Sequence, residues 1–201
     1  MLGLPKATEL SKQLPKNAIY AKFQMNTAEK AKIDADISRI TIVNEVSAEK
    51  VHIAAGDQVK SFFVLLVALK KKDFDDKTII TISKLIPQNM LLVLECGDEA
   101  KLATYHTKLM QTEWKRKEEL SVELKGLNLD AVWENIIIQI GGITVDQGNT
   151  LDEQIAVDEQ RMRIQKELDR LTKQAKSEKQ PKKKFELVQK MNRLKKELEE
   201  I

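Results

Sequence analysis

Apolar side chains in the last fifty residues recur at spacings of four and three, which places them on one face of an α-helix. Residues 151–201 contain no Gly and one Pro, so little interrupts helix formation there. The pattern predicts one helix over residues 151–177 and a second from about Lys182, with the apolar phase reset near Pro181. The predicted coiled-coil seam consists of Ile164, Leu168, Leu171, Ala175, Leu187, Met191, Leu194, Leu198 and Ile201.

The phase reset at Pro181 favours an antiparallel helical hairpin over one continuous rod. A narrow apolar stripe of this kind packs against another helix, but the spacing does not identify which helix. We therefore expect the hairpin to be completed by docking on its own domain, by forming a homodimer or by binding a partner protein. This association device is the most specific functional signal in the sequence.

Positive charge concentrates where the two predicted helices meet. Between Arg170 and Lys184 the chain has seven basic residues and one acidic residue, Glu178. Residues 1–148 contain 20 basic and 20 acidic residues, so the C-terminal segment carries the whole net charge of +3. These lysines could contact nucleic-acid phosphates or an acidic partner, or they could simply be solvated. They are Lys173, Lys176, Lys179, Lys182, Lys183 and Lys184.

Composition excludes several classes of protein. Aromatic residues make up only 4% of the chain, which argues against a surface that stacks nucleic-acid bases. Cys96 is the only cysteine, so no intrachain disulfide can form and a reducing compartment fits best. The N-terminus lacks an apolar signal core, and the longest apolar run, residues 62–69, is too short to span a bilayer. We expect a cytoplasmic protein with no membrane partner.

Residues 1–148 have the pattern of an α+β domain, and residues 149–201 that of the helical hairpin. Apolar, β-branched runs predict strands over residues 37–46, 51–55, 59–69, 90–96, 101–106 and 120–124. Capping residues and apolar spacing predict helices near residues 6–14, 26–35, 75–85 and 128–140. We therefore predict a mixed sheet of about five or six strands flanked by helices. The strand over residues 59–69 is apolar on both faces and should be central.

Few residues in this sequence can support catalysis. His52 and His106 are the only histidines, so with one cysteine a Cys/His metal cluster is excluded. His52 lies in a predicted strand, where a structural role is the simpler interpretation. The glycines at 141, 142 and 148 lack the Lys-Ser/Thr of a phosphate-binding loop. We expect no metal and no cofactor.

One catalytic hypothesis remains. The predicted order of elements is similar to the core of restriction-endonuclease-like nucleases, which place an acidic residue on the second strand and acidic-x-Lys on the third to hold a divalent metal. The nearest counterparts here are Asp57, Gln58 and Lys60, although Asp57 adjoins the triplet and does not lie on the preceding strand. Asp36 and Glu45 are more distant carboxylates. The simpler alternative is a turn followed by a solvated strand end, so a degenerate site is favoured over an active enzyme.

Four segments together resemble a known family. They are GLPKATELSKQLPK, LIPQNMLLVLE, LKGLNLDAVWENIIIQI and SEKQPKKKFELVQKMNRLKKELEEI, in that order. The chain is similar over nearly its whole length to the bacterial family called domain of unknown function 4391, most specifically at residues 126–130 and 178–187. The resemblance implies no assigned activity. Members are similar to small proteins encoded near DNA methyltransferases and helicases of restriction or phage-defence islands, which implies such proteins as partners.

Three hypotheses follow from the sequence. The first is a non-enzymatic accessory protein with an α+β body and a C-terminal association arm. The second is a metal-dependent nuclease or its degenerate relative. The third is a nucleic-acid-binding module that uses the lysines between the two helices.

Overall fold

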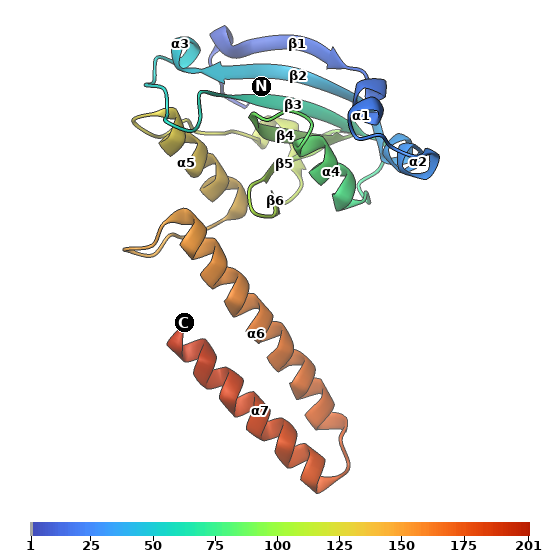
Figure 1. The fold of residues 1–201 in the computed structure, drawn as a ribbon, viewed down its shortest axis with the longest axis vertical. Coiled ribbons are helices and arrows are strands. Elements are labelled where there is room, and N and C mark those ends of the chain that lie inside the picture. Colours follow the sequence, from blue (N-terminus) through green and yellow to red (C-terminus); the bar gives the residue numbers. More distant parts are fainter. Residues whose placement is uncertain (1) are drawn as a thin grey trace. The chain divides into compact units, whose positions relative to one another are not determined.

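A computed structural model describes residues 2–201, which form two compact units (Figure 1). The first unit ends at Ile143 and contains a mixed β-sheet with flanking helices. The second unit, Thr144–Ile201, contains two long helices. The predicted fold class, an α+β sheet domain followed by a C-terminal helical hairpin, is confirmed.

A single mixed sheet organises the first unit. Its strands are β1 (Glu9–Leu14), β2 (Ile37–Ser47), β3 (Ser61–Leu69), β4 (Asn89–Cys96), β5 (Glu99–Tyr105), β6 (Leu109–Gln111) and β7 (Lys115–Arg116). They lie side by side in the order β1-β2-β3-β4-β5-β6, and β7 pairs with β5. Every neighbouring pair is antiparallel except β3 and β4, which run parallel. The sheet therefore needs one crossover connection, between β3 and β4.

Helices cover both faces of the sheet. They are α1 (Lys16–Lys22), α2 (Thr27–Asp36), α3 (Ala48–Val51), α4 (Asp76–Ser83) and α5 (Leu129–Gly141). On one face, Leu65 of β3 belongs to a core cluster with Ile33 of α2 and Ile79 of α4. On the other face, Phe62 of β3 packs against Trp133 of α5, with ring centroids 5.1 Å apart. Both Leu65 and Phe62 are fully buried, so the prediction of a central β3 is confirmed.

Side-chain caps fix the starts of α2, α4 and α5, as the sequence predicts. The Asn26 side chain accepts a hydrogen bond from the Glu29 N–H at 3.0 Å, and the Glu29 carboxylate accepts one from the Asn26 N–H at 2.8 Å. Asp75 caps α4 and Asn128 caps α5 in the same way, each through one backbone N–H. These caps satisfy amide groups that have no partner inside the helix.

The predicted three-strand meander is wrong at its middle strand. Residues 51–55 do not form a strand: α3 occupies Ala48–Val51, and His52 ends it in the left-handed conformation with φ 55°. Strands β2 and β3 pair directly with each other, and the pairing extends from Ile37 opposite Leu69 to Ser47 opposite Ser61. The apolar run at residues 51–53 has no free strand edge to pair with, because β2 and β3 already occupy each other's edges.

Two further predicted elements differ. Residues 6–14 form one 3₁₀ turn, Lys6–Thr8, followed by β1, and not a helix, because β1 pairs with the free edge of β2. Residues 120–124 make only an isolated bridge between Ser121 and Leu2. In both places the available pairing partner decides the local structure.

Asp130, in the first turn of α5, fixes the loop that leads into β3. Its carboxylate accepts hydrogen bonds from the N–H groups of Asp57 (2.6 Å), Gln58 (3.2 Å) and Val59 (2.7 Å). The Val59 N–H, followed by the other two, holds the pKa of Asp130 below its ordinary value of 3.8. A Cβ on Gly56 would lie 2.2 Å from Asp130 Oδ1 and 2.7 Å from the Asp130 backbone N. Only glycine therefore permits this close approach.

The close approach predicts that Gly56→Ala destabilises the first unit. The added methyl group must push the loop away from backbone as well as side-chain atoms of Asp130, which should cost about 1–3 kcal/mol of unfolding free energy. Urea denaturation of the two proteins measures the difference. Gln58→Ala is the matched control, because this side chain in the same loop is exposed and its removal should change stability by less than about 0.5 kcal/mol. Equal losses in both variants would contradict the prediction.

The lowered pKa of Asp130 predicts a specific pH dependence. Its ionised form stabilises the fold above pH 3.8, and that contribution is lost as pH falls through the lower pKa of the folded state. Asp130→Asn should therefore be less stable than wild type at neutral pH, and the gap should narrow in acid. Thermal unfolding measured from about pH 7 to about pH 3 tests this. A gap that stays constant over this range would show that the charge of Asp130 is not responsible.

Candidate functional site

The second unit is an antiparallel helical hairpin built from α6 (Leu151–Ser177) and α7 (Pro181–Glu200) (Figure 1). Thr150 and Glu153 form a reciprocal capping box at the start of α6. Pro181 occupies the first turn of α7, where its missing N–H is not needed. Arg161 Nη2 donates a hydrogen bond to the carbonyl oxygen of Ile201 at 3.0 Å, so the end of α7 returns to the first half of α6.

The predicted seam is buried unequally on the two helices. Its four residues on α6 are between 3% and 7% exposed. The seam residues from α7 are only half-buried, and none of the residues of α7, all of which the structure describes, is buried. The buried set is Ile164, Leu168, Leu171 and Ala175, and the half-buried set is Leu187, Met191, Leu194, Leu198 and Ile201. The hairpin therefore leaves the apolar stripe of α7 partly open to solvent.

Three apolar side chains of the hairpin lie outside the seam and were not predicted. Met162 on α6 is 59% exposed, and Phe185 and Val188 on α7 are 62% and 40% exposed. The heptad pattern does not identify them, because they fall between the seam positions. The visible signal in the sequence is the FELV segment, where Phe185 and Val188 flank a seam leucine.

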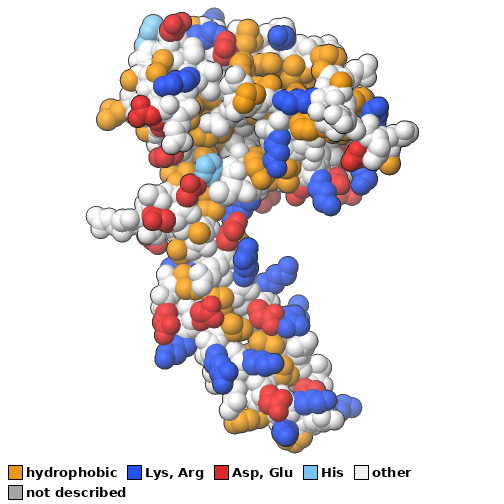
Figure 2. All heavy atoms as spheres, in the orientation of Figure 1, with side chains coloured by type: hydrophobic (Ala, Val, Ile, Leu, Met, Phe, Trp, Pro, Cys, Tyr) orange, Lys and Arg blue, Asp and Glu red, His pale blue; other side chains and the backbone are white. Residues whose placement is uncertain are grey.

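The predicted cluster of lysines lies at the bend of the hairpin, around the short connection between α6 and α7. Figure 2 shows Lys and Arg side chains exposed along the hairpin and at its bend. All six lysines are exposed, and within the described chain none of them forms an ion pair. They are Lys173, Lys176, Lys179, Lys182, Lys183 and Lys184. Their charge is therefore available to an external partner.

The nuclease-like candidates lie in the loop before β3 and not on a strand. The backbone N–H groups of Asp57 and Gln58 donate to Asp130, and their side chains are exposed. Lys60 Nζ donates to the carbonyl oxygen of Gly56 at 2.7 Å, which closes the loop on itself. The structure thus brings these residues together around a structural aspartate.

The two carboxylates Asp36 and Glu45 do not converge on that loop. Asp36 directly precedes β2, whereas Glu45 lies near its end and pairs with Lys50 at 2.6 Å. The eight residues of extended chain between them place the two positions about 30 Å apart. Among residues 2–201, no group of three or more His, Cys, Asp or Glu side chains could hold a metal ion.

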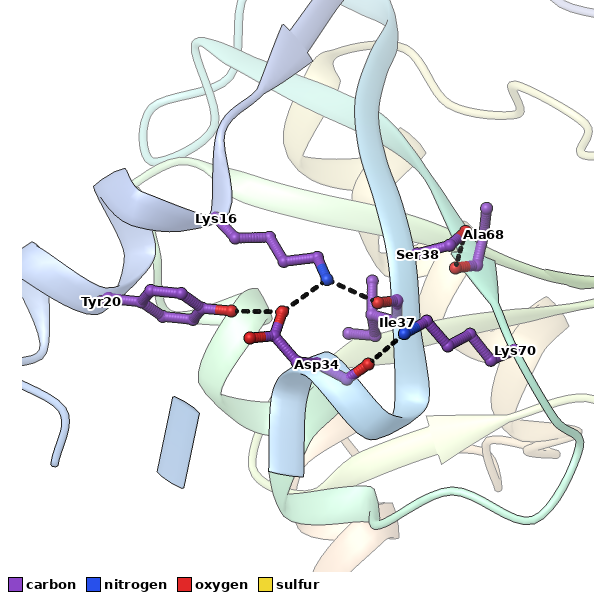
Figure 3. A network of polar contacts seen from close by, with 7 residues as sticks. All are labelled: Lys16, Tyr20, Asp34, Ile37, Ser38, Ala68 and Lys70. Atoms are coloured by element: carbon purple, nitrogen blue, oxygen red, sulfur yellow. Dashed lines mark hydrogen bonds and ion pairs between the residues drawn. The ribbon is translucent and has the colours of Figure 1, made fainter. Parts of the chain in front are cut away.

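A polar network anchors α1 and α2 to the sheet (Figure 3). Lys16 Nζ and Tyr20 Oη both donate to Asp34 Oδ1 at 2.7 Å, and Lys16 Nζ also donates to the Ile37 carbonyl oxygen. Lys70 Nζ donates to the carbonyl oxygen of Asp34 at 2.5 Å. Burial, followed by the hydrogen bond to Asp34, raises the pKa of Tyr20 to about 12. The donors Lys16 and Tyr20 and the acceptor Asp34 satisfy one another, so this network fastens α1 and α2 together.

A small cavity that no sequence pattern indicates lies between the end of α2 and the loop after β3. Its volume is about 380 Å³, and Asp36 in its wall is only 4% exposed. The Asp36 carboxylate is 3.1 Å from Lys71 Nζ and accepts a hydrogen bond from the Asp75 N–H at 3.2 Å. A cation and a backbone amide therefore compensate this buried carboxylate. The remaining lining residues are Lys32, Ala35, Asp73 and Phe74.

Two aromatic rings near the cavity are engaged by lysines. Lys101 Nζ lies 4.7 Å from the ring centroid of Phe74 and 5.2 Å from that of Trp114. Lys72 Nζ lies 5.5 Å from the Trp114 centroid and also pairs with Glu99. Desolvation by burial lowers the pKa of Lys101, while contact with two rings favours its charged form. These rings therefore hold the protein's own cations and do not form a free stacking surface.

Comparison with known proteins gives one match. The sequence profile of the family described as Domain of unknown function (DUF4391) matches residues 2–198. No curated protein and no solved structure matches the chain. No helix within residues 2–201 combines the length and the apolar character that crossing a membrane requires. The resemblance found in the four sequence segments is confirmed over nearly the whole chain, which belongs to the DUF4391 family.

Proposed function

We propose that this protein is a non-enzymatic accessory protein that associates with other proteins through its C-terminal helical hairpin. One observation carries the proposal: α7 has an apolar stripe along its length but no buried residue. Half-buried leucines gain only part of the free energy that full burial supplies, about 1.5–3 kcal/mol for each side chain. A further helical surface packed on the hairpin would supply the rest.

The polar clusters and aromatic rings of the first unit also support this proposal. Its polar clusters around Asp130, Asp34 and Asp36 are internally compensated and fasten loops or helices to the sheet. Its aromatic rings at Phe74 and Trp114 face lysines of the same unit. A body of this kind suits a platform that presents the hairpin.

Family resemblance extends the proposal to a biological setting. Members of the DUF4391 family resemble proteins encoded near DNA methyltransferases and helicases. We therefore propose a helicase or methyltransferase of a restriction or phage-defence complex as the larger partner, in the bacterial cytoplasm.

Charged residues in the seam should abolish association. Leu168→Glu and Leu194→Glu each place a carboxylate in the apolar contact between the helices, which should cost at least about 3 kcal/mol of hairpin stability. Size-exclusion chromatography with light scattering, together with co-purification of a tagged chain, measures assembly. Circular dichroism should show loss of helix, while the thermal transition of the first unit remains.

Matched controls place the same carboxylate outside the seam. Gln160→Glu on α6 and Gln189→Glu on α7 change exposed residues and should leave assembly intact. If the seam variants assemble as well as these controls, the hairpin is not the association surface.

A further inference from the structure

The charges of α7 are arranged against its own helix dipole. A helix N-terminus favours acidic side chains and its C-terminus favours basic ones, by about 0.3–1 kcal/mol each. The first turn of α7 contains no acidic residue and its last turn no basic residue. Its first turn instead carries three lysines and its last turn three glutamates: Lys182, Lys183 and Lys184, and Glu197, Glu199 and Glu200. This pattern weakens an isolated α7.

The neighbouring helix shows the opposite, dipole-favouring arrangement. The first turn of α6 contains Asp152 and Glu153, and Lys176 lies in its last turn. Both helices belong to the same hairpin, so a general preference of the chain for one order of charges does not explain α7. A contact outside the helix does explain it, because such a contact can offset the unfavourable dipole term.

An exposed face of α7 combines these charges with apolar side chains. Positions spaced four, four, three and four apart share one side of a helix. On α7 this face contains Lys184, Val188, Asn192, Lys195 and Glu199, and Phe185 adjoins it. Val188 is 40% and Phe185 is 62% exposed. The face therefore begins with a lysine and apolar side chains and ends with a glutamate, with Asn192 and Lys195 between them.

We propose that a second copy of the chain packs on this face, with the two α7 helices antiparallel about a twofold axis. In this arrangement the first turn of each α7, which carries the three lysines, lies beside the last turn of the other, which carries the three glutamates, along a contact about 30 Å long. A parallel arrangement would place like charges together. A twofold interface must be complementary to itself, and this distribution of charge has that property. The inference rests on the proposed association role of the hairpin and names its partner.

A second copy explains more of α7 than nucleic acid does. A phosphate backbone would account for Lys182, Lys183 and Lys184, but it would repel the glutamates of the last turn. It would also leave Phe185 and Val188 in water. The antiparallel helix of a second chain contacts all three kinds of residue.

Three charge variants of the full chain test the proposal. The acidic variant carries Lys182→Glu, Lys183→Glu and Lys184→Glu, and the basic variant carries Glu197→Lys, Glu199→Lys and Glu200→Lys. The swapped variant carries all six changes. Each change improves the match between charge and helix dipole, so circular dichroism should show α7 retained or strengthened in every variant. Loss of association therefore cannot be attributed to unfolding of α7.

Sedimentation at low salt gives the readout. Wild type should sediment as a dimer, and the acidic and basic variants should each dissociate at least about tenfold more readily, because like charges then meet along the contact. Mixing these two variants, or making the swapped variant, should restore the dimer. Val188→Asp should weaken it without changing any of the six charges.

Other outcomes would overturn the proposal. A monomeric wild type, or a swapped variant that stays monomeric, excludes antiparallel pairing of α7. A monomeric wild type that binds duplex DNA, with binding lost in the acidic variant, assigns the lysines to phosphates. If the wild type is monomeric but seam variants still lose a co-purified partner, the proposed association role stands and only the second copy is excluded.

Discussion

The parallel pairing of β3 with β4 determines how the first unit is built. Antiparallel neighbours can be joined by a short turn, but a parallel pair needs a crossover that passes over one face of the sheet. Here α4 makes that crossover and packs with α2 on one face, which leaves the other face of β3 to be covered by α5. Covering both faces buries β3 fully and places the start of α5 against the loop that enters β3. The Asp130 contact is thus a consequence of the layered arrangement.

The two units obtain their stability in different ways. The first unit buries side chains such as Phe62 and Leu65 completely, between layers that it supplies itself. The hairpin has one layer of two helices, so only α6 reaches full burial along its seam, while α7 does not. Two helices cannot enclose an apolar core, whereas four helices can, which is why bundles of four are common. The hairpin is therefore the part of the chain that leaves an apolar stripe only half-buried.

Local signals in the sequence predicted those elements that depend on few distant residues. The long helices follow from apolar spacing, α5 also from its cap Asn128, and β3 and β4 follow from continuous apolar runs. Residues 51–55 and 6–14 were mispredicted because strand pairing, and not propensity, decides them. Contacts across long separations were also out of reach: Asp130 meets a loop more than seventy residues earlier. The same limit hid the cavity beside Asp36, whose walls come from α2 and the loop after β3.

The proposed second copy and the proposed larger partner would use different faces of α7, because the seam and the face through Val188 lie at different angles around the helix. Seam positions such as Met191 and Leu194 point toward α6 and remain accessible only along the groove between the helices. Val188 follows the seam residue Leu187, and consecutive residues of a helix are rotated by about 100°, so the face through Val188 points away from the groove. A second copy that packs on this outer face therefore leaves the groove between α6 and α7 open on its other side. The two proposed contacts are therefore compatible with each other on one short hairpin.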